Sequence, residues 1–509
     1  AEGMPQSWGR NTYGQLGDGT NADSDVPVQV LGLGGIVDVA SGGHHVLALR
    51  SSKTVWAWGA NGHGQLGDGS QVATNVAVEV PGLAQVMAVA AGEYHSLALK
   101  SDGTVWAWGR NDLSQLGTGV SGDGLSPVQV IDPADPTGFL TDVTAIAAGQ
   151  SHCLARKSDG TVVAWGSNLY GQLGDGGAYV SRGDPAPVLR PGDPTGRLSD
   201  VVSIACGFLH SLALKSDGAV WAWGHNGYGQ IGDATIGPSR LFPTQTDPIR
   251  MPDAIAIAGG AYHSLAIRQN GIVWAWGAND NGQCGNDAYA YWTRPVLVWD
   301  KNDDSGFLTN GAAIAGGAWH SVAIKTDGSV YAWGDNRFGQ LGDGTRVGRF
   351  SAVPTAPLPP MTNVAAGFFH TVAVHAAPGN QPPVVNAGAD QTADEGDTVS
   401  LEPALFVDSD PADTHTATID WGDGTVEDGV VDEASGAITG DHVYVDNGTY
   451  TVTVGVTDAA GDSGQGEFEV VVANVAPTVD AGADQTVDIG AGASFSGAFT
   501  DPGQNDTHE

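Results

Sequence analysis

Apolar and polar residues alternate with a period of two along most of the chain, and one alternating block recurs many times. A representative copy is HSLALKSDGTVWAWG, residues 95–109, in which Leu97 and Leu99 point one way and Ala98 points the other. Alternation on both sides of a Ser-Asp-Gly turn predicts a β-hairpin. Because large side chains occupy one face and alanines the other, we expect each sheet to pack between two similar sheets.

Two motifs mark the repeat, and each occurs seven times. The first is a Trp-Gly pair followed by a Gly-Gln-Leu-Gly-like turn, with its tryptophan at Trp8, Trp58, Trp108, Trp165, Trp223, Trp276 and Trp333. The second is Gly-x-x-His, which ends at His45, His95, His152, His210, His263, His320 and His370. Successive histidines are 50 to 58 residues apart. An internal period of this length indicates a solenoid, a propeller or an array.

The first and last repeats are each half complete. Residues 1–30 contain SWGRNTYGQLGDG without the first half of a unit, and residues 364–376 have the Gly-x-x-His strand without a Trp-Gly strand after it. A circular array, in which N-terminal strands pair with C-terminal ones, explains both defects and covers the edges of an open array. Six complete units and two halves therefore predict an all-β, seven-bladed propeller over residues 1–376.

The full repeat, GxxHSLALxxDGTVWAWGxNxxGQLGDG, resembles that of the RCC1 family, the regulator of chromosome condensation. The resemblance covers residues 1–376 and implies a seven-bladed β-propeller. Members of the family include a nuclear guanine-nucleotide exchange factor, a plant UV photoreceptor and a secreted bacterial inhibitor of β-lactamase. The resemblance therefore implies the fold much more strongly than an activity. The Gly-Trp-Arg-His-Thr motif of the photoreceptors is missing here, so light sensing is not supported.

The repeat ends before a Pro-rich linker at residues 377–385. The segments ATIDWGDG (417–424), DHVY (441–444) and NGTYTVTVGVTDAAGD (447–462) resemble the PKD domain. The resemblance implies an immunoglobulin-like β-sandwich, common in bacterial surface and secreted proteins, over residues 386–474. The alternation in TYTVTVGVT favours a sandwich independently.

A second PKD-like copy begins after the first and occupies residues 475–509. Its DAGADQTVDIG (480–490) repeats NAGADQTADEG (386–396), and it stops before a Trp-Gly-Asp-Gly turn. Because half a sandwich does not fold alone, we expect the natural polypeptide to continue beyond Glu509 or the chain to be a cut product.

Charge and motif content narrow the function classes. The net charge is −37, which argues against a nucleic-acid partner. From Pro378 onwards the chain has 26 Asp and Glu and no Lys or Arg. The chain has no run of eighteen apolar residues, so the sequence predicts no transmembrane segment. The sequence contains no nucleophile elbow, HExxH, P-loop or paired-carboxylate motif, so we expect no enzyme and no required cofactor.

Several repeated polar residues have a structural interpretation. Seven equivalent histidines around a propeller cannot meet at one ion, so we expect each imidazole to hydrogen-bond backbone within its own blade. Asp68, Asp175 and Asp343 are expected to cap their own turns and not to bind calcium. Three cysteines are predicted to be buried free thiols, the alternative being a disulfide or a reactive thiol, at Cys153, Cys206 and Cys284.

The PKD-like part offers the one set of candidate metal ligands. Four carboxylates lie close in sequence, and their spacing permits calcium binding: Asp408, Asp410, Asp413 and Asp423. No complete ligand template is present, and solvated acidic loops are the favoured interpretation.

The two residues inside each Gly-x-x-His vary while their neighbours are almost constant, and many of them are large. A loop at a strand end faces one end of a propeller, so we expect these residues to form a ring around the channel mouth. In the secreted inhibitor of the family, similar loops look like the contact surface. The residues predicted to bind a partner are His44, Glu93, Tyr94, Phe208, Leu209, Tyr262, Trp319, Phe368 and Phe369. The alternative, weighed equally, is that they only pack against adjacent loops.

These observations favour a secreted or cell-surface bacterial protein with a non-catalytic propeller head held on acidic β-sandwich spacers. The head would recognise a protein or a ligand. The alternative is a structural subunit of an extracellular filament, sheath or surface assembly, in which the partner is another copy of the chain. The least favoured hypothesis is nucleotide exchange on a small GTPase, which follows from the family name alone.

Overall fold

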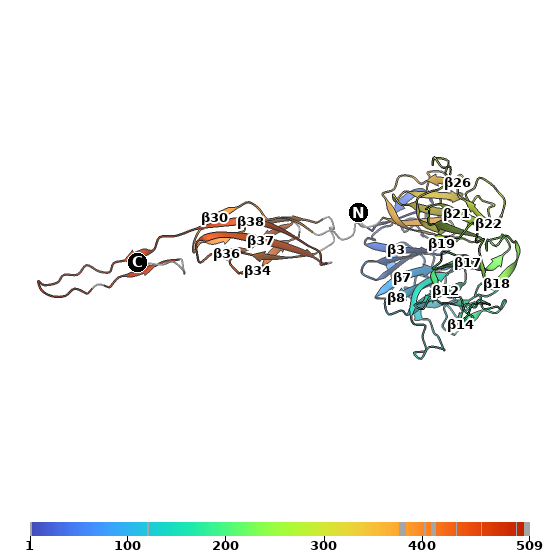
Figure 1. The fold of residues 1–509 in the computed structure, drawn as a ribbon, viewed down its shortest axis with the longest axis horizontal. Coiled ribbons are helices and arrows are strands. Elements are labelled where there is room, and N and C mark those ends of the chain that lie inside the picture. Colours follow the sequence, from blue (N-terminus) through green and yellow to red (C-terminus); the bar gives the residue numbers. More distant parts are fainter. Residues whose placement is uncertain are drawn as a thin grey trace. The chain divides into compact units, whose positions relative to one another are not determined.

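The computed structural model describes residues 3–119, 122–375, 383–401, 404–408, 414–433, 435–459, 461–494 and 496–502. The described residues form strands, turns and loops without any helix. The chain divides into two compact units, residues 1–377 and 378–509 (Figure 1). Residues 376–382, which include most of the predicted linker, lie outside the described residues.

The first unit consists of seven four-stranded antiparallel sheets. Six of them follow the chain without interruption. Their strands are β3 (Ile36–Ser41), β4 (His45–Arg50), β5 (Val55–Gly59) and β6 (Thr74–Glu79); β7 (Val86–Ala91), β8 (His95–Lys100), β9 (Val105–Gly109) and β10 (Gly124–Gln129); and β11 (Val143–Ala148), β12 (His152–Lys157), β13 (Val162–Gly166) and β14 (Arg182–Pro187). The next three sheets are β15 (Val201–Cys206), β16 (His210–Lys215), β17 (Val220–Asn226) and β18 (Gly237–Gln245); β19 (Ala254–Gly259), β20 (His263–Arg268), β21 (Val273–Gly277) and β22 (Trp292–Leu297); and β23 (Gly311–Gly316), β24 (His320–Lys325), β25 (Val330–Gly334) and β26 (Arg349–Pro354).

The seventh sheet joins the two ends of the repeat region. Its strand order is β2-β1-β28-β27, with β1 (Pro5–Gly9) and β2 (Ser24–Gln29) from the N-terminal end and β27 (Met361–Ala366) and β28 (His370–His375) from the C-terminal end. β1 pairs with β28 so that Pro5 lies opposite Val374 and Gly9 opposite His370. The predicted seven-bladed propeller and its closure by terminal strands are both confirmed.

Large and small side chains from neighbouring blades interlock, as the alternation predicts. One core cluster joins Leu47 and Leu49 of β4 to Ala98 of β8 and Trp108 of β9. The tryptophan of every Trp-Gly pair is fully buried. Each such indole donates a hydrogen bond of 2.8–3.0 Å across the seam between blades to the backbone carbonyl of a Gln-Leu-Gly-type glutamine, as Trp108 does to Gln65.

The Gly-x-x-His histidines also join neighbouring blades, and this corrects the expectation that they bond backbone within their own blade. Nε2 of His45 lies 2.9 Å from the hydroxyl of Ser96 in the next blade, and that hydroxyl donates to the carbonyl of Gln65. Equivalent contacts of 2.9–3.2 Å link His95 to Cys153, His152 to Ser211, His210 to Ser264, His263 to Ser321 and His320 to Thr371. The structural interpretation therefore holds, with the partner in the adjacent sheet.

The Asp residues of the Gly-Asp-Gly turns cap their own turns, as predicted. Oδ1 of Asp68 accepts hydrogen bonds from the Ser70 amide and from Nδ2 of Asn61. Asp175 and Asp343 make the same pair of contacts in their own turns. The cysteines are free, with Cys153 and Cys284 buried and Cys206 half-buried.

The second unit is a β-sandwich whose main sheet has the order β29-β32-β35-β34-β33-β37-β38-β30. Its strands are β29 (Val384–Asn386), β30 (Gln391–Asp394), β32 (Ala404–Val407), β33 (His415–Asp420), β34 (Val426–Asp432), β35 (Ala437–Thr439), β37 (Gly448–Asp458) and β38 (Ser463–Ala473); β31 (Thr398–Ser400) pairs with β36 (Asp441–Val443). β34 pairs with β33 through Gly429 and with β35 from Val430, so it passes between the two faces of the sandwich.

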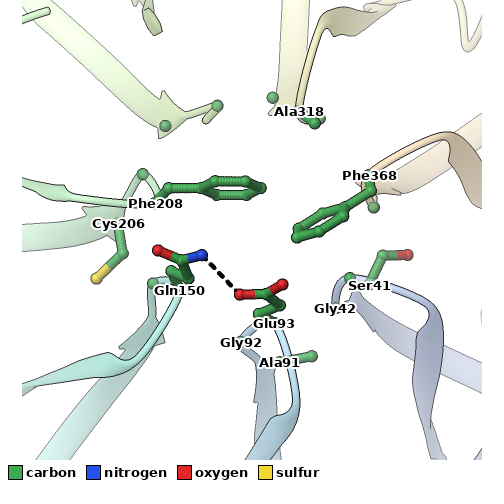
Figure 2. A pocket seen from close by; sticks show the side chains of 18 of the residues that line it. Ser41, Gly42, Ala91, Gly92, Glu93, Gln150, Cys206, Phe208, Ala318 and Phe368 are labelled. Carbon is green, nitrogen blue, oxygen red and sulfur yellow. Dashed lines mark hydrogen bonds between the residues drawn. The ribbon is translucent and has the colours of Figure 1, made fainter. Parts of the chain in front are cut away.

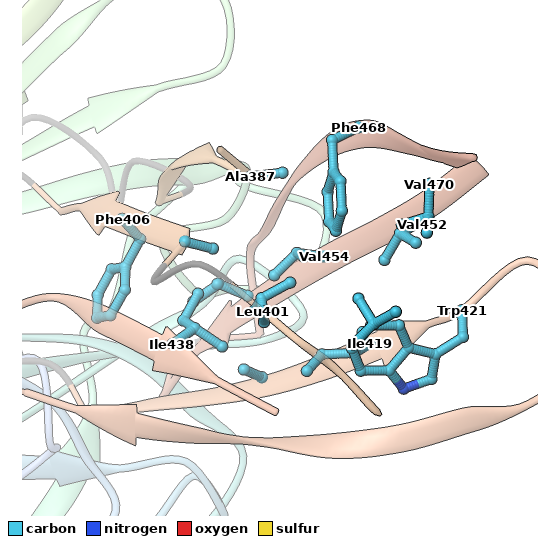
Figure 3. Packing of buried hydrophobic residues seen from close by; sticks show 14 of the residues in the cluster. Ala387, Leu401, Phe406, Ile419, Trp421, Ile438, Val452, Val454, Phe468 and Val470 are labelled. Atoms are coloured by element: carbon cyan, nitrogen blue, oxygen red, sulfur yellow. The ribbon is translucent and has the colours of Figure 1, made fainter. Parts of the chain in front are cut away.

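Trp421 is fully buried in the sandwich core, together with alternate residues of β37 such as Val452 and Val454 (Figure 3). The hydroxyl of Tyr444, from the His-x-Tyr segment, donates to the Trp421 carbonyl at 2.9 Å. The beginning of the second copy contributes only the exposed pair β39 (Thr478–Asp480) and β40 (Ala498–Thr500) among the residues described there. The predicted sandwich is therefore complete in one copy.

Candidate functional site

The variable residues of every Gly-x-x-His lie at one end of the propeller because of the hairpin register. In each blade the histidine pairs with the glycine of the Trp-Gly strand, as His45 does with Gly59. The residue after that glycine then donates its amide hydrogen to the carbonyl of the second variable residue, at 2.8–2.9 Å in all seven blades. The Gly-x-x-His loop and the loop after Trp-Gly therefore share one surface.

Neighbouring Gly-x-x-His loops are also hydrogen-bonded to one another around the axis. The amide of Gly43 lies 3.2 Å from the Glu93 carbonyl, the amide of Glu93 donates to Gln150, and the amide of Gln150 donates to Phe208. On the other side the amide of Phe368 donates to Gly43. These contacts fix the loops as a ring around the channel mouth, which is the arrangement predicted for them.

A small cavity of about 100 Å³ lies inside this ring and is lined by residues of all seven blades (Figure 2). Most of its wall is glycine and alanine backbone. Glu93, Gln150, Phe208 and Phe368 extend side chains into it, and Nε2 of Gln150 donates to Oε2 of Glu93 at 2.7 Å. The rings of Phe208 and Phe368 are in contact, with centroids 4.6 Å apart. Glu93 is the only charged residue of the lining.

Aromatic rings extend from this mouth across several blades without a break. Phe208 contacts Tyr262 at 6.1 Å between centroids, and Tyr262 contacts Trp319 at 5.6 Å. On the other side Phe368 contacts His44 at 5.3 Å. We call the rings of His44, Phe208, Tyr262, Trp319, Phe368 and Phe369 the aromatic face.

The remaining predicted residues lie near this face. Tyr94 packs on His63 with centroids 5.2 Å apart and beneath the guanidinium of Arg110 at 5.5 Å. Leu209 is half-buried, like the other predicted residues. All nine therefore keep part of their surface exposed, and all except Leu209 make the side-chain contacts with neighbouring loops given above or below. The geometry accommodates both interpretations given above, packing and partner contact.

Sequence reasoning missed a second set of rim residues. The residue two before the glutamine of each Gly-Gln turn also varies inside a constant frame, and it supplies aromatic rings to the same surface: Tyr13, His63, Tyr170, Tyr228 and Phe338. Tyr228 contacts Tyr262 at 5.1 Å, and Phe338 contacts Phe369 at 5.1 Å. The variation at this position, between an Asn two residues before and a Gln two residues after that are the same in all seven repeats, is the signal that could have identified them.

The electrostatics of the rim favour neutral aromatic groups. Burial, together with the charge of Arg10, lowers the pKa of His44 to about 4, so this imidazole is neutral at pH 7. Burial also raises the phenol pKa of Tyr262. The guanidinium of Arg10 lies over the ring of Phe338 at 4.9 Å. The aromatic face is therefore largely uncharged, with the carboxylate of Glu93 at its centre.

The candidate calcium ligands are not brought together. Asp408 is hydrogen-bonded to Nε2 of His415 at 3.0 Å, at the start of β33, and Asp423 to Nε2 of His442 at 2.8 Å, beyond its end. The two carboxylates thus lie at opposite ends of one strand and cannot share an ion, which corrects the four-residue set. Asp410 and Asp413 lie outside the described residues. Within the described ranges no three His, Cys, Asp or Glu residues are grouped to hold a metal.

The part of the chain that the structure describes contains no helix long and apolar enough to cross a membrane.

Comparisons with known proteins agree with the two-part architecture. A family model described as RCC1-like domain matches residues 1–195 and 132–380, and one described as PKD domain matches residues 380–472. The chain is 32% identical over 204 residues to the probable E3 ubiquitin-protein ligase HERC6 of Homo sapiens, an alignment covering 39% of this chain and 19% of that protein. It is 30% identical over 228 residues to protein pim1 of Schizosaccharomyces pombe, covering 42% of this chain and 40% of that protein. The chain thus spans less than half the length of these relatives.

A solved structure shows the same propeller fold. Prp20p of Saccharomyces cerevisiae, described with its binding properties to Gsp1p and histones, superposes with a TM-score of 0.61 at 24% identity. That superposition covers 74% of this chain and 92% of Prp20p.

Proposed function

The chain belongs to the RCC1-like domain family, and we propose that its propeller is a non-catalytic recognition head that binds a protein partner through the aromatic face. We further propose that the head is held outside the cell on acidic β-sandwich spacers. The observation that carries the first proposal is the continuous line of aromatic contacts that forms the aromatic face at the channel mouth. Aromatic residues are enriched in the centres of protein interfaces, where a few of them supply most of the binding energy.

The size of the cavity supports a protein partner over a small ligand. Pockets for small molecules and cofactors usually enclose about 300–1,000 Å³. The cavity at the mouth has about 100 Å³, and the surface around it is broad and formed by loops of several blades. Because those loops are hydrogen-bonded in a ring, little ordering is needed when a partner binds.

The relatives are consistent with such a role. Prp20p, which shares the propeller fold, is described as binding the proteins Gsp1p and histones. Gsp1p and histones are ligands of Prp20p. The partner of the present chain would depend on its own rim residues. A propeller that serves as a binding scaffold needs no catalytic group, in keeping with the motif content of the sequence.

Charge supports the spacer part of the proposal. Most of the described carboxylates of the second unit are exposed, and the region after Pro378 has no Lys or Arg. Like charges on a solvated β-sandwich oppose self-association and adhesion to other acidic surfaces. Such a segment suits a spacer that keeps a binding head accessible.

Photo-cross-linking of the full chain tests the head. With p-benzoylphenylalanine in place of Tyr262, irradiation in the presence of the producing cells should give one discrete protein adduct, and Trp319→Ala should reduce its yield at least tenfold. Met87, an exposed residue at the opposite end of β7, is the matched control and should give no adduct.

Equal adducts at both positions, or none at Tyr262, would contradict the recognition head. An adduct consisting of two copies of the chain would instead favour the structural-assembly alternative. Protease treatment of intact cells tests the location, because a head outside the cell must be degraded while cytoplasmic proteins survive.

A further inference from the structure

We infer that the channel mouth accepts one basic side chain, lysine or arginine, projecting from the protein partner, with its charge on the carboxylate of Glu93 and its aliphatic stem against Phe208 and Phe368. This inference deepens the proposed function and rests on it. It names the chemistry that the partner must present at the centre of the aromatic face.

The volume of the mouth limits what can enter it. A cavity of about 100 Å³ is well below the roughly 300–1,000 Å³ of a small-molecule pocket, so it takes the end of one long side chain and not a folded segment. The walls are glycine and alanine backbone with two phenylalanine rings at the entrance. An extended side chain with an apolar stem and a polar end matches this profile.

The charge at the mouth selects a cation. Glu93 is the single charged residue among those that line the cavity. The amide of Gln150 donates to one of its oxygens at 2.7 Å, which orients the carboxylate without neutralising it. A carboxylate beside aromatic rings attracts a cation by both Coulomb and cation–π interactions, and the low-dielectric wall strengthens each of them.

The cations nearest to this site are already engaged elsewhere. Arg110 pairs with Asp112 at 2.6 Å and covers the ring of Tyr94. Arg10 lies over Phe338 at 4.9 Å and Phe369 at 5.9 Å. Neither guanidinium belongs to the residues that line the cavity, so within that lining Glu93 has no cationic partner.

The backbone is shaped to bring the acid and the rings together. A Cβ on Gly43 would lie 2.8 Å from the Glu93 carbonyl, 3.3 Å from its Cγ and 3.4 Å from Cζ of Phe368. Glycine at this position therefore lets Glu93 and Phe368 occupy the same side of the mouth. The net charge of −37 acts in the same direction, because it attracts a basic partner during encounter.

The test uses the full chain and three synthetic probes. The first is acetyl-Tyr-Gly-Arg-Gly-Tyr-amide, the second is the same peptide with citrulline in place of arginine, and the third is agmatine. Citrulline preserves the shape of arginine, but a carbonyl oxygen replaces one guanidinium NH2, so the charge and two N–H donors are lost. Calorimetry at low salt should show at least tenfold tighter binding of the arginine peptide than of the citrulline peptide, and weaker binding of agmatine.

Glu93→Gln should reduce that ratio to about one, because the amide keeps the contact with Gln150 and loses the charge. Glu79→Gln on the outer strand β6 makes the same change in net charge and should leave the ratio intact. If Glu93→Gln does not fold, the probes on the unmodified chain still decide. The preference for the arginine peptide should weaken as salt is added. The NMR signals of the Phe208 and Phe368 rings should broaden when that peptide binds. Both results would support the site.

Equal affinity for the arginine and citrulline peptides, undetectable binding of both, or discrimination that survives Glu93→Gln in a folded variant would overturn the inference. Agmatine binding as tightly as the peptide would assign the mouth to a small cation and would also overturn it. Cross-linking at Tyr262 does not depend on Glu93. An adduct there with failed peptide discrimination would remove this inference and leave the recognition head standing.

Discussion

Histidine occupies opposite electrostatic environments in the two units. In the propeller, seven histidines are fully buried between blades, and burial lowers the pKa of His45, His152, His263 and His320 to about 3 and that of His95 to about 4. In the sandwich, His415 has a side chain only 4% exposed, yet contacts with Asp408 and Glu433 raise its pKa despite the opposing effect of burial. Burial thus sets the direction of the pKa shift in the propeller, whereas in the sandwich two neighbouring carboxylates outweigh it.

The difference follows from what each imidazole must satisfy. A propeller histidine faces a hydroxyl whose own proton is given to a glutamine carbonyl, so the Nε2 hydrogen must be donated to that hydroxyl oxygen. One proton is enough, and the neutral ring suits an uncharged seam. His415 faces carboxylates at both nitrogens, at 3.0 Å each, and both contacts are best made by the protonated ring.

Acidification gives the largest expected effect. A histidine with a lowered folded pKa binds its proton more readily when unfolded, so stability falls as pH drops below the unfolded value of about 6.5. At pH 5.5 each propeller histidine should cost about 1 kcal/mol, or several kcal/mol for seven. Calorimetric unfolding between pH 8 and pH 5 measures this loss.

The sandwich should respond in the opposite direction. The raised pKa of His415 contributes stability that is complete below about pH 6.5 and is lost as pH rises through the folded pKa. His415→Gln should abolish that dependence. A propeller transition that is unchanged between pH 7.5 and pH 5.5, or propeller imidazole signals that titrate near 6.5, would contradict the comparison.

Gly207→Ala should have the next largest effect, about 3–5 kcal/mol of lost stability. Gly207 is the glycine of a Gly-x-x-His, and a Cβ there would overlap Cε1 of His210 and the carbonyl of Gly260. Gly62→Ala is the matched control, because a Cβ at that loop position meets nothing within 4 Å. Urea denaturation should show the same stability for Gly62→Ala as for the unmodified chain. Similar losses of stability in the two variants would show that the close contact with the His210 imidazole is not the reason for the glycine.

Val46→Thr should have the smallest effect, a gain of about 1 kcal/mol. His370 is the one Gly-x-x-His histidine whose Nε2 has no hydrogen-bond partner among the described residues, because Val46 occupies the position held by Ser96 or Thr371 in other blades. Threonine has nearly the same shape as valine and supplies the hydroxyl. Val55→Thr, at another fully buried site, should instead destabilise. A loss for Val46→Thr would show that His370 needs no such partner.

Much of the fold could be predicted because the same sequence pattern recurs in seven repeats. The half-repeats around Trp8 and His370 predicted closure, and β1 pairs with β28 as expected. The partner of each histidine could not be predicted, because His45 and Ser96 belong to different units and nothing local couples them. A repeat shows which positions are constant without showing which neighbouring copy each one contacts.

The site was predictable in part for a similar reason. Variable residues such as Tyr262 and Phe368 stood out against a constant frame, and the structure places them around the mouth. Tyr228 and Phe338 vary in the same way but belong to the other loop of the blade. In six blades the hydrogen bonds that bring those two loops to one surface join residues 16 positions apart across the hairpin, as Ala60 does to His44. In the sandwich, closeness in sequence was misleading, since β33 separates Asp408 from Asp423.

The sequence alone determined the number of blades, the hairpin pattern, the circular closure and the change to an acidic sandwich, because periodicity and composition are properties of the chain itself. The tertiary structure decided that histidines hold adjacent blades together, that Glu93 is the one charge inside the mouth, and that rings from different blades form one surface. Those facts depend on how the sheets are rotated about a common axis, which brings together residues that no local pattern relates.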